Sequence, residues 1–176
     1  MTQVSSAVPA NSHAAPTALL VAAIAIAAIL GAYYFEYVVK LAPCPLCLEQ
    51  RIPYYVGIPL ALIVAVAAWR RMPARLVGLG FAVLAIVFLS GAGLGVYHAG
   101  IEWKFWPGPT ECSGQLGQLS GNGGLLEQIQ STSVVRCDEA AWRLFGISLA
   151  GYNVIVSLFL AAASFGCARR LFARAS

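Results

Sequence analysis

Long stretches without a charged side chain constrain this chain more than any other feature of its sequence. Four stretches hold no Asp, Glu, Lys or Arg, and together they make up half of the 176 residues: 17–35, 52–69, 76–101 and 144–168. A helix needs about 20 apolar residues to cross the hydrocarbon core of a bilayer, where it satisfies its own backbone hydrogen bonds. The sequence therefore predicts an all-α membrane protein with four transmembrane helices in these ranges.

Composition agrees with this prediction and excludes two other classes of protein. The chain is 60% hydrophobic and 10% charged, whereas a soluble domain is about 25% charged and a disordered chain is poor in apolar residues. The first stretch has one alternative, a cleaved signal peptide. Its flank lacks Lys and Arg, its apolar run is long, and Gly31-Ala32-Tyr33-Tyr34 is a poor cleavage site.

Short connections between the stretches predict how the helices are arranged. The link between the second and third stretches is too short for anything except an antiparallel turn, so an up-down four-helix bundle is expected. The whole chain, 1–176, then forms a single membrane domain, with 36–51 and 102–143 as two loops on the other side of the membrane.

The basic residues predict the orientation of this bundle. Two segments on one side carry three arginines each, six of the nine in the chain: Arg70, Arg71, Arg75, Arg169, Arg170 and Arg174. Segments rich in Lys and Arg stay in the cytoplasm. Both termini are therefore expected in the cytoplasm, with the two loops outside in the periplasm. The net charge of +4 is then a signal of topology, and we expect no nucleic-acid partner.

Four of the five cysteines fall in the two outer loops, where disulfides persist. Cys44 and Cys47 belong to the first loop, and Cys112 and Cys137 belong to the second. Cys167 lies near the cytoplasmic end of the last stretch, where it serves as a small apolar residue.

The spacing of Cys44 and Cys47 favours a redox-active pair over a structural disulfide. A bond that closes so short a loop restrains the unfolded chain less than one that closes a long loop. Pro45 suits the first position of a helix, which places Cys47 in the first turn, where a thiolate is favoured. Arg51 comes four residues later and can hold a thiolate or the carbonyl oxygen of a bound acceptor. Alternatively, Arg51 only extends its side chain to the membrane surface.

Two further candidate sites have weaker signals. A zinc site made of the four outer cysteines is disfavoured, because Cys112 and Cys137 lie far apart in the sequence, unlike the close pairs of structural zinc sites; no metal site is predicted. His98 lies at the outer end of the third stretch, with Glu102 one turn further on. It is either an interfacial histidine bonded to a neighbour or head group, or a group that donates to a quinone carbonyl.

Several motifs together resemble one family, the DsbB family of bacterial disulfide-bond formation proteins. The resemblance covers nearly the whole chain after residue 16. It rests on segments that occur in order: Cys44-Pro45-Leu46-Cys47 with Arg51, Tyr97-His98, Phe105-Trp106-Pro107-Gly108-Pro109 with Cys112, and Cys137-Asp138-Glu139 with Trp142 and Gly146-Ile147-Ser148.

The resemblance implies a bacterial inner-membrane enzyme, a protein dithiol:quinone oxidoreductase that reoxidises a periplasmic DsbA-like protein of thioredoxin fold. Cys112 would be attacked by the reduced partner, and Cys137 would then attack Cys44 and leave Cys47 as a thiolate. The electrons would pass to a membrane quinone, ubiquinone or menaquinone, held by Arg51 with His98 assisting. The resting pairing of the four cysteines stays open.

Two other functions remain as alternatives. One is a non-enzymatic four-span scaffold whose disulfides are only structural. The other is an enzyme similar to vitamin K epoxide reductase, although its Cys-x-x-Cys is expected later in the chain.

Overall fold

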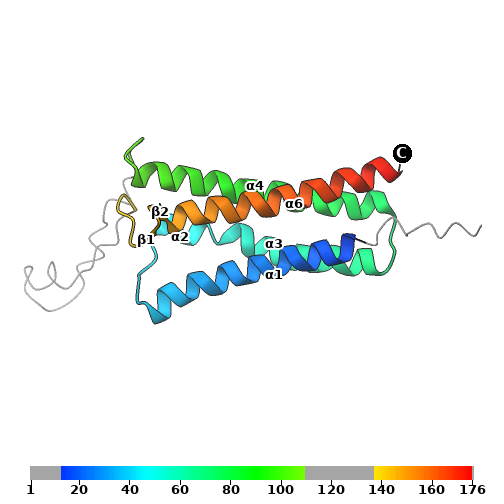
Figure 1. Cartoon of the computed structure of the whole chain (residues 1–176), viewed down its shortest axis with the longest axis horizontal. Helices are drawn as coiled ribbons and strands as arrows, with labels where there is room; N and C mark the ends of the chain where they lie inside the picture. Colours follow the sequence, from blue (N-terminus) through cyan, green and yellow to red (C-terminus); the bar gives the residue numbers. More distant parts are fainter. Residues whose placement is uncertain (1–12, 110–136, 176) are drawn as a thin grey trace, which may run out of the picture.

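Four long apolar helices run side by side along the molecule (Figure 1). The structure is a computed structural model, and it describes residues 13–109 and 137–175. The long helices are α1 (Ala14–Tyr33), α3 (Ile52–Trp69), α4 (Ala74–Glu102) and α6 (Leu149–Ala175). All four are long and apolar enough to cross a membrane, two of them together with short adjoining helices. The predicted four-helix membrane fold is confirmed.

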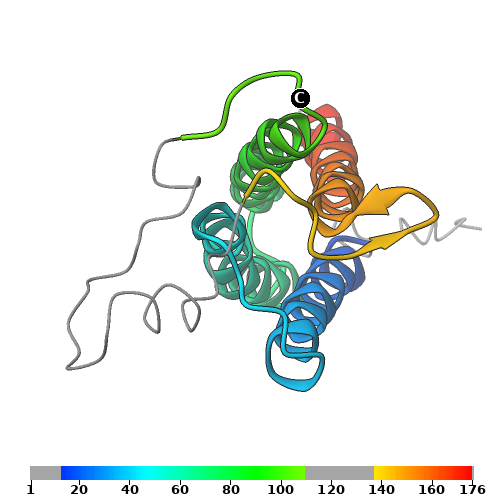
Figure 2. The same cartoon turned by 90° about the vertical axis from the view of Figure 1, so that its left-hand side faces the viewer.

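Successive helices run in opposite directions and close into a ring. In this ring α1 packs on α3, α3 on α4, α4 on α6 and α6 on α1, with α4 and α6 in the most extensive contact. Figure 2 looks onto the end where α1 and α4 finish and α3 and α6 start. We call it the cysteine end, because Cys44, Cys47 and Cys137 lie there. Both arginine segments lie at the opposite end, where Arg75 Nη2 donates to the carbonyl oxygen of Ala175 over 3.0 Å.

The fourth helix starts later and continues further than its charge-free stretch predicts. Residues 143–148 form a small antiparallel hairpin of β1 (Arg143–Leu144) and β2 (Ile147–Ser148), and α6 begins only at Leu149. In the turn between β1 and β2, Phe145 has φ +50° and Gly146 has φ +80°. A right-handed helix does not accommodate this backbone conformation. An apolar composition predicts membrane depth but does not reveal such a turn.

The first loop is more ordered than predicted. After α1 the chain continues as one turn of π-helix, η1 (Tyr34–Val38), and a second short helix, α2 (Pro45–Glu49), precedes α3. Cys44 is the N-cap of α2 and Pro45 takes its first position, as the sequence predicted for this dipeptide. Gln50 and Arg51 separate the end of α2 from the start of α3.

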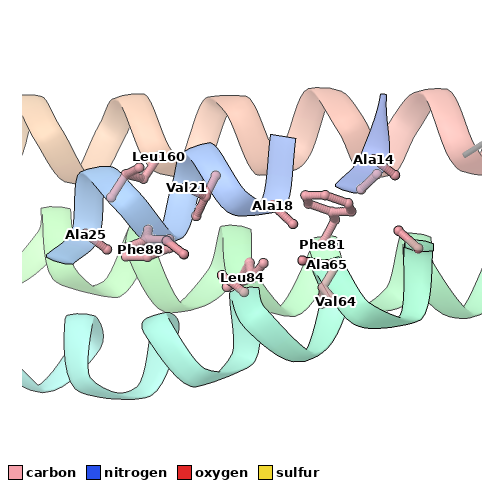
Figure 3. Packing of buried hydrophobic residues seen from close by; sticks show 14 of the residues in the cluster. Ala14, Ala18, Val21, Ala25, Val64, Ala65, Phe81, Leu84, Phe88 and Leu160 are labelled. Carbon is pink, nitrogen blue, oxygen red and sulfur yellow. The ribbon is translucent and has the colours of Figure 1, made fainter. Parts of the chain in front are cut away.

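The core of the bundle pairs small side chains with large ones (Figure 3). On α1 the buried positions are mostly alanines, such as Ala18 and Ala25, and they face Phe81 and Phe88 of α4, which are completely buried. Small residues let helix backbones come close, which is how helices associate within lipid.

Glycines on α4 bring it especially close to α6. A Cβ atom at Gly95 would lie 2.8 Å from Cγ2 of Val154, and one at Gly91 would lie 3.3 Å from Oγ of Ser157. These glycines therefore let the two backbones come close, and the contact brings the polar residues of α6 next to α4.

Candidate functional site

A cavity of about 440 Å³ opens at the cysteine end. Its volume falls within the usual range of small-molecule sites, and its lining is mostly apolar. One wall comes from α1 and η1 and another from the first turns of α6, and polar groups reach the cavity from several elements, among them Glu36 of η1, His98 of α4 and Asn153 of α6. Cys44, Cys47, Arg51 and His98 all line it, so the cavity brings together four of the six side chains selected from the sequence.

Cys44 and Cys47 are in direct contact at the start of α2. The backbone N–H of Cys47 donates to Sγ of Cys44 over 3.2 Å. Cys44 is 3% exposed, whereas Cys47 is more accessible. The pKa of the Cys44 thiol is raised above its ordinary value, first by its hydrogen bond to the Cys47 side chain and then by burial. Cys44 therefore keeps its proton in the reduced pair, and Cys47 is the member available as a thiolate.

Cys137 comes from the second loop and is buried beside this pair. It is 1% exposed and belongs to one apolar cluster with Cys44, Leu46 and Ile101, against which Cys47 packs. Next to it, Lys104 Nζ donates to the carbonyl oxygen and to Oδ2 of Asp138 over 2.9 and 2.8 Å. This ion pair ties the end of α4 to the segment that carries Cys137. Cys112 lies outside the described residues.

His98 is buried between the cysteines and a carboxylate. It is 3% exposed. Its Nε2 lies 3.7 Å from Sγ of Cys44 and 3.8 Å from Oε1 of Glu102, and its Nδ1 lies 2.6 Å from Nε2 of Gln50. Its burial does not fit contact with a lipid head group, whereas its contacts with Gln50 and Cys44 fit a histidine bonded to its neighbours. Donation to a quinone carbonyl stays a prediction.

A chain of hydrogen bonds leads from His98 across the bundle. Gln50 Oε1 accepts from Asn153 Nδ2 over 2.6 Å, and Asn153 Oδ1 accepts from the hydroxyl of Tyr54 over 2.6 Å. The hydroxyls of Tyr54 and Ser157 then lie 3.0 Å apart. Buried polar groups in a bilayer need such partners, and this chain holds Gln50 and, through it, the histidine ring.

Arg51 also lines the cavity and is held by residues of α1 and η1. Its Nη1 donates to Oε2 of Glu36 over 2.6 Å, and its guanidinium lies 5.3 Å from the centre of the Tyr33 ring. Glu36 belongs to the π-helix, a rare element that is often found at functional sites. The pairing fixes the guanidinium at the cavity wall, and the Arg51 side chain is 11% exposed.

Glu102 completes the group of buried polar residues. Its side chain is 5% exposed, Oε1 faces His98, and Oε2 has no hydrogen-bond partner among the described residues. Near it lie three potential metal ligands, Cys44, Cys47 and His98. Their ligand atoms are all within 4.8 Å of one another.

The sequence missed several of these partners. Gln50, Glu36 and Asn153 received no functional role, although each contacts a predicted site residue or its partner. A signal did exist for Asn153, since it is the one side-chain amide within the charge-free stretch 144–168, and polar groups at such depth are often functional.

Comparison with known proteins identifies one family. The family model described as disulfide bond formation protein DsbB matches residues 14–167. The chain is 32% identical over 142 residues to disulfide bond formation protein B 2 of Pseudomonas syringae, and the match covers 80% of each protein. It is 29% identical to disulfide bond formation protein B of a Shewanella strain, with 82% of this chain and 81% of the relative covered. No solved structure matches.

Proposed function

We propose, because this chain belongs to the DsbB family of disulfide bond formation proteins, that it transfers electrons from a soluble dithiol protein to a quinone in the membrane. It is a multi-pass membrane protein with a disulfide-forming role by family. The proposal adds the donor, a periplasmic DsbA-like protein of thioredoxin fold, and the acceptor, ubiquinone or menaquinone.

One observation supports this reaction above all others. Cys137 of the second loop lies in the same buried cluster as Cys44 and Cys47, directly beside a mostly apolar cavity that Arg51 also lines. A purely structural disulfide needs no cavity, whereas a thiol relay that ends on a lipid-soluble acceptor needs both the contact between cysteines and the cavity.

The thiol steps follow from disulfide exchange. A thiolate of the partner attacks Cys112 of a Cys112–Cys137 disulfide, which forms a mixed disulfide and releases Cys137. The Cys137 thiolate attacks Cys44, forms a Cys44–Cys137 bond and releases Cys47 as a thiolate. The partner's second thiolate then attacks its own sulfur in the mixed disulfide, so the partner leaves oxidised and Cys112 is freed.

The two pairs then return to their starting states. Cys112 attacks Cys137 and re-forms the loop disulfide, which leaves Cys44 and Cys47 as a reduced pair. This pair loses two electrons and two protons when its own disulfide re-forms. The partner has then lost two electrons and two protons, and the protein is unchanged.

The cavity residues fit a quinone. Apolar side chains such as Phe35 and Trp142 would cover its ring, while Arg51 and His98 would hold its oxygens. A bound quinone supplies the acceptor of two electrons and two protons. Arg51 contributes a positive charge that favours the thiolate of Cys47, and His98 contributes a ring N–H beside Cys44. The apolar lining excludes water from the exchanging sulfurs.

The proposal also includes an orientation. Arginine-rich segments remain in the cytoplasm, so the end that bears Arg70 and Arg170 would face the cytoplasm together with both termini. The cysteine end would then face the periplasm of a bacterial inner membrane, where a soluble oxidant meets it.

Purified full-length protein with a quinone and a reduced DsbA-like protein tests this function. We expect catalytic quinone reduction, followed by absorbance, with one partner disulfide formed per quinone reduced. Cys44→Ser and Cys47→Ser should abolish turnover, while Cys167→Ser, which alters a cysteine at the opposite end of the bundle, should retain it. Arg51→His should mainly raise the KM for quinone.

Turnover in Cys44→Ser or Cys47→Ser would show that the relay is wrong. The scaffold alternative predicts something different, namely that the outer cysteines stay oxidised when quinone is depleted. Alkylation of free thiols in quinone-depleted membranes distinguishes the two, because the proposed enzyme accumulates reduced cysteines under that condition.

A further inference from the structure

Four side chains with metal-binding atoms converge at the cysteine end. Cys44 and Cys47 come from the first loop and the short helix α2, and His98 and Glu102 come from the last turns of α4. We propose that these four side chains bind one zinc ion when the Cys44–Cys47 pair is reduced. The site differs from the four-cysteine zinc site considered from the sequence, since two of its ligands lie about fifty residues further along the chain.

The distances between ligand atoms suit a tetrahedral zinc site. With Zn–S bonds of about 2.3 Å and Zn–N bonds of about 2.0 Å, neighbouring sulfur and nitrogen ligands lie about 3.6 Å apart. Sγ of Cys44 and Nε2 of His98 lie 3.7 Å apart, and Sγ of Cys47 falls within the same 4.8 Å group. Oε1 of Glu102 lies 3.8 Å from Nε2 of His98 but outside the 4.8 Å group, so its carboxyl group has to move toward the sulfurs to become the fourth ligand.

The charge of the site favours a divalent cation. Glu102 is buried, and its Oε2 has no partner among the described residues. A buried polar atom without a partner is costly, and more so when it carries charge. The arginine at the cavity wall is already paired with Glu36. A zinc ion would satisfy the Glu102 carboxylate and both thiolates at once.

Gln50 can support the histidine in both states. In the structure its Nε2 lies 2.6 Å from Nδ1 of His98, which places the ring proton on Nε2. Zinc at Nε2 requires the proton on Nδ1, and histidine ligands usually donate that proton to a neighbouring acceptor. A turn of the Gln50 amide presents Oε1 to Nδ1–H, and Asn153 can turn in the same way because its amide also has both a donor and an acceptor.

Zinc binding of this kind is restricted to the reduced protein. The ion displaces two protons from the thiols and no electron moves, because zinc has no redox chemistry of its own. Once bound, it prevents the two sulfurs from forming a disulfide. The site would thus hold the protein in its reduced state, independently of which acceptor normally oxidises it.

Cobalt(II), a coloured substitute for zinc, provides the test. Full-length protein in detergent is reduced with a phosphine, freed of metal and titrated with Co²⁺. We expect one ion per chain, with thiolate-to-cobalt charge-transfer absorption and the strong visible bands of a tetrahedral site. Zinc should abolish these bands and should protect Cys44 and Cys47 from alkylation. Oxidised protein should give no such spectrum, and an equal spectrum from it would refute the proposal.

Variants assign the ligands. Cys47→Ser and His98→Ala should lose the tetrahedral spectrum, and Glu102→Gln should weaken zinc binding at least tenfold. Glu49→Gln and Cys167→Ser are matched controls and should bind like the original protein. A chain with both Cys112→Ser and Cys137→Ser should also bind, so loss of binding there would show that the other pair holds the metal.

An unchanged affinity in Glu102→Gln would overturn the four-ligand site. Failure of this proposal and failure of the proposed function are distinguishable. The cobalt titration contains neither quinone nor partner, and quinone turnover is measured without added metal.

Discussion

At the scale of single residues, the least expected feature is the polar chain behind His98. Gln50, Asn153, Tyr54 and Ser157 connect α3, α4 and α6 through hydrogen bonds at a depth where water is scarce. Each member has a partner on both sides, so the chain holds the histidine next to Cys44 without a charged group in contact with lipid.

Asn153→Leu should damage both stability and turnover. The substitution removes the donor to Gln50 and the acceptor for Tyr54, and a buried group left without its partner costs about 1–3 kcal/mol. We expect the free energy of unfolding in mixed micelles to fall by that amount. Quinone-linked turnover should also fall at temperatures where the variant is fully folded, because Gln50 no longer holds the histidine ring.

Ser164→Ala is the matched control for this substitution. Ser164 is buried in the same helix, but its Oγ has no hydrogen-bond partner among the described residues. Its removal should leave both quantities unchanged or improve stability. If Asn153→Leu behaved like Ser164→Ala, the polar chain would have no role in the site.

How far the sequence predicted the site differs from one residue to the next. Cys44, Cys47 and Arg51 were predictable because they share one short segment and so must lie close together. Glu36 was not, since its contact with Arg51 depends on the turn of π-helix that follows α1. The contact between Cys137 and Cys44 also depends on a loop path that spacing along the chain does not determine.

At the scale of helices, the most extensive contact is the one between α4 and α6. Gly95 faces α6, where a Cβ atom would meet Val154 and Asn153, whereas Gly93 two residues away has no atom within 4 Å of such a Cβ. The two glycines lie in the same helix, and glycine has the same low helix propensity at both positions. They are therefore suited to a direct comparison.

Gly95→Ala should be less stable than Gly93→Ala. Alanine favours a helix over glycine by about 1 kcal/mol at either position, but at Gly95 the added methyl group overpacks the contact, which costs about 1–3 kcal/mol. Unfolding in mixed micelles measures the difference, from which helix preference cancels. Equal stabilities would mean that α4 and α6 accommodate the added methyl group at Gly95 with no loss of free energy of unfolding.

The sequence predicted the central part of each helix correctly and the ends of the helices less well. Charge-free composition located all four spans, because lipid tolerates no other sequence over such lengths. It could not show the hairpin before α6, since Phe145 and Gly146 are as apolar as the helix beside them. Local backbone geometry determines those ends.

At the scale of the whole molecule, the two ends of the bundle differ in charge and in chemistry. Six of the nine arginines lie at one end, in the segments 70–75 and 169–174, and the Cys44–Cys47 pair and Cys137 lie at the other. This separation was predictable, because each crossing reverses the chain and the number of crossings alone assigns every loop to a side.

Single cysteines at the two ends test the proposed orientation in cells. In a chain whose own cysteines are replaced by serine, Trp103→Cys and Trp69→Cys introduce exposed thiols at the cysteine end and the arginine end respectively. A membrane-impermeant thiol reagent should label the first in intact spheroplasts and the second only after lysis. The reverse pattern would refute the orientation.

The position of the cavity between α1 and α6 also affects how its reactant is supplied. These neighbours have the least extensive contact in the ring, and both contribute apolar residues to the cavity wall. A hydrophobic reactant that enters between these two helices would reach the cavity by diffusion within the bilayer, a two-dimensional fluid. The quantity that governs saturation is its mole fraction among lipids, so rates measured at one bulk concentration will change with the amount of detergent or lipid present.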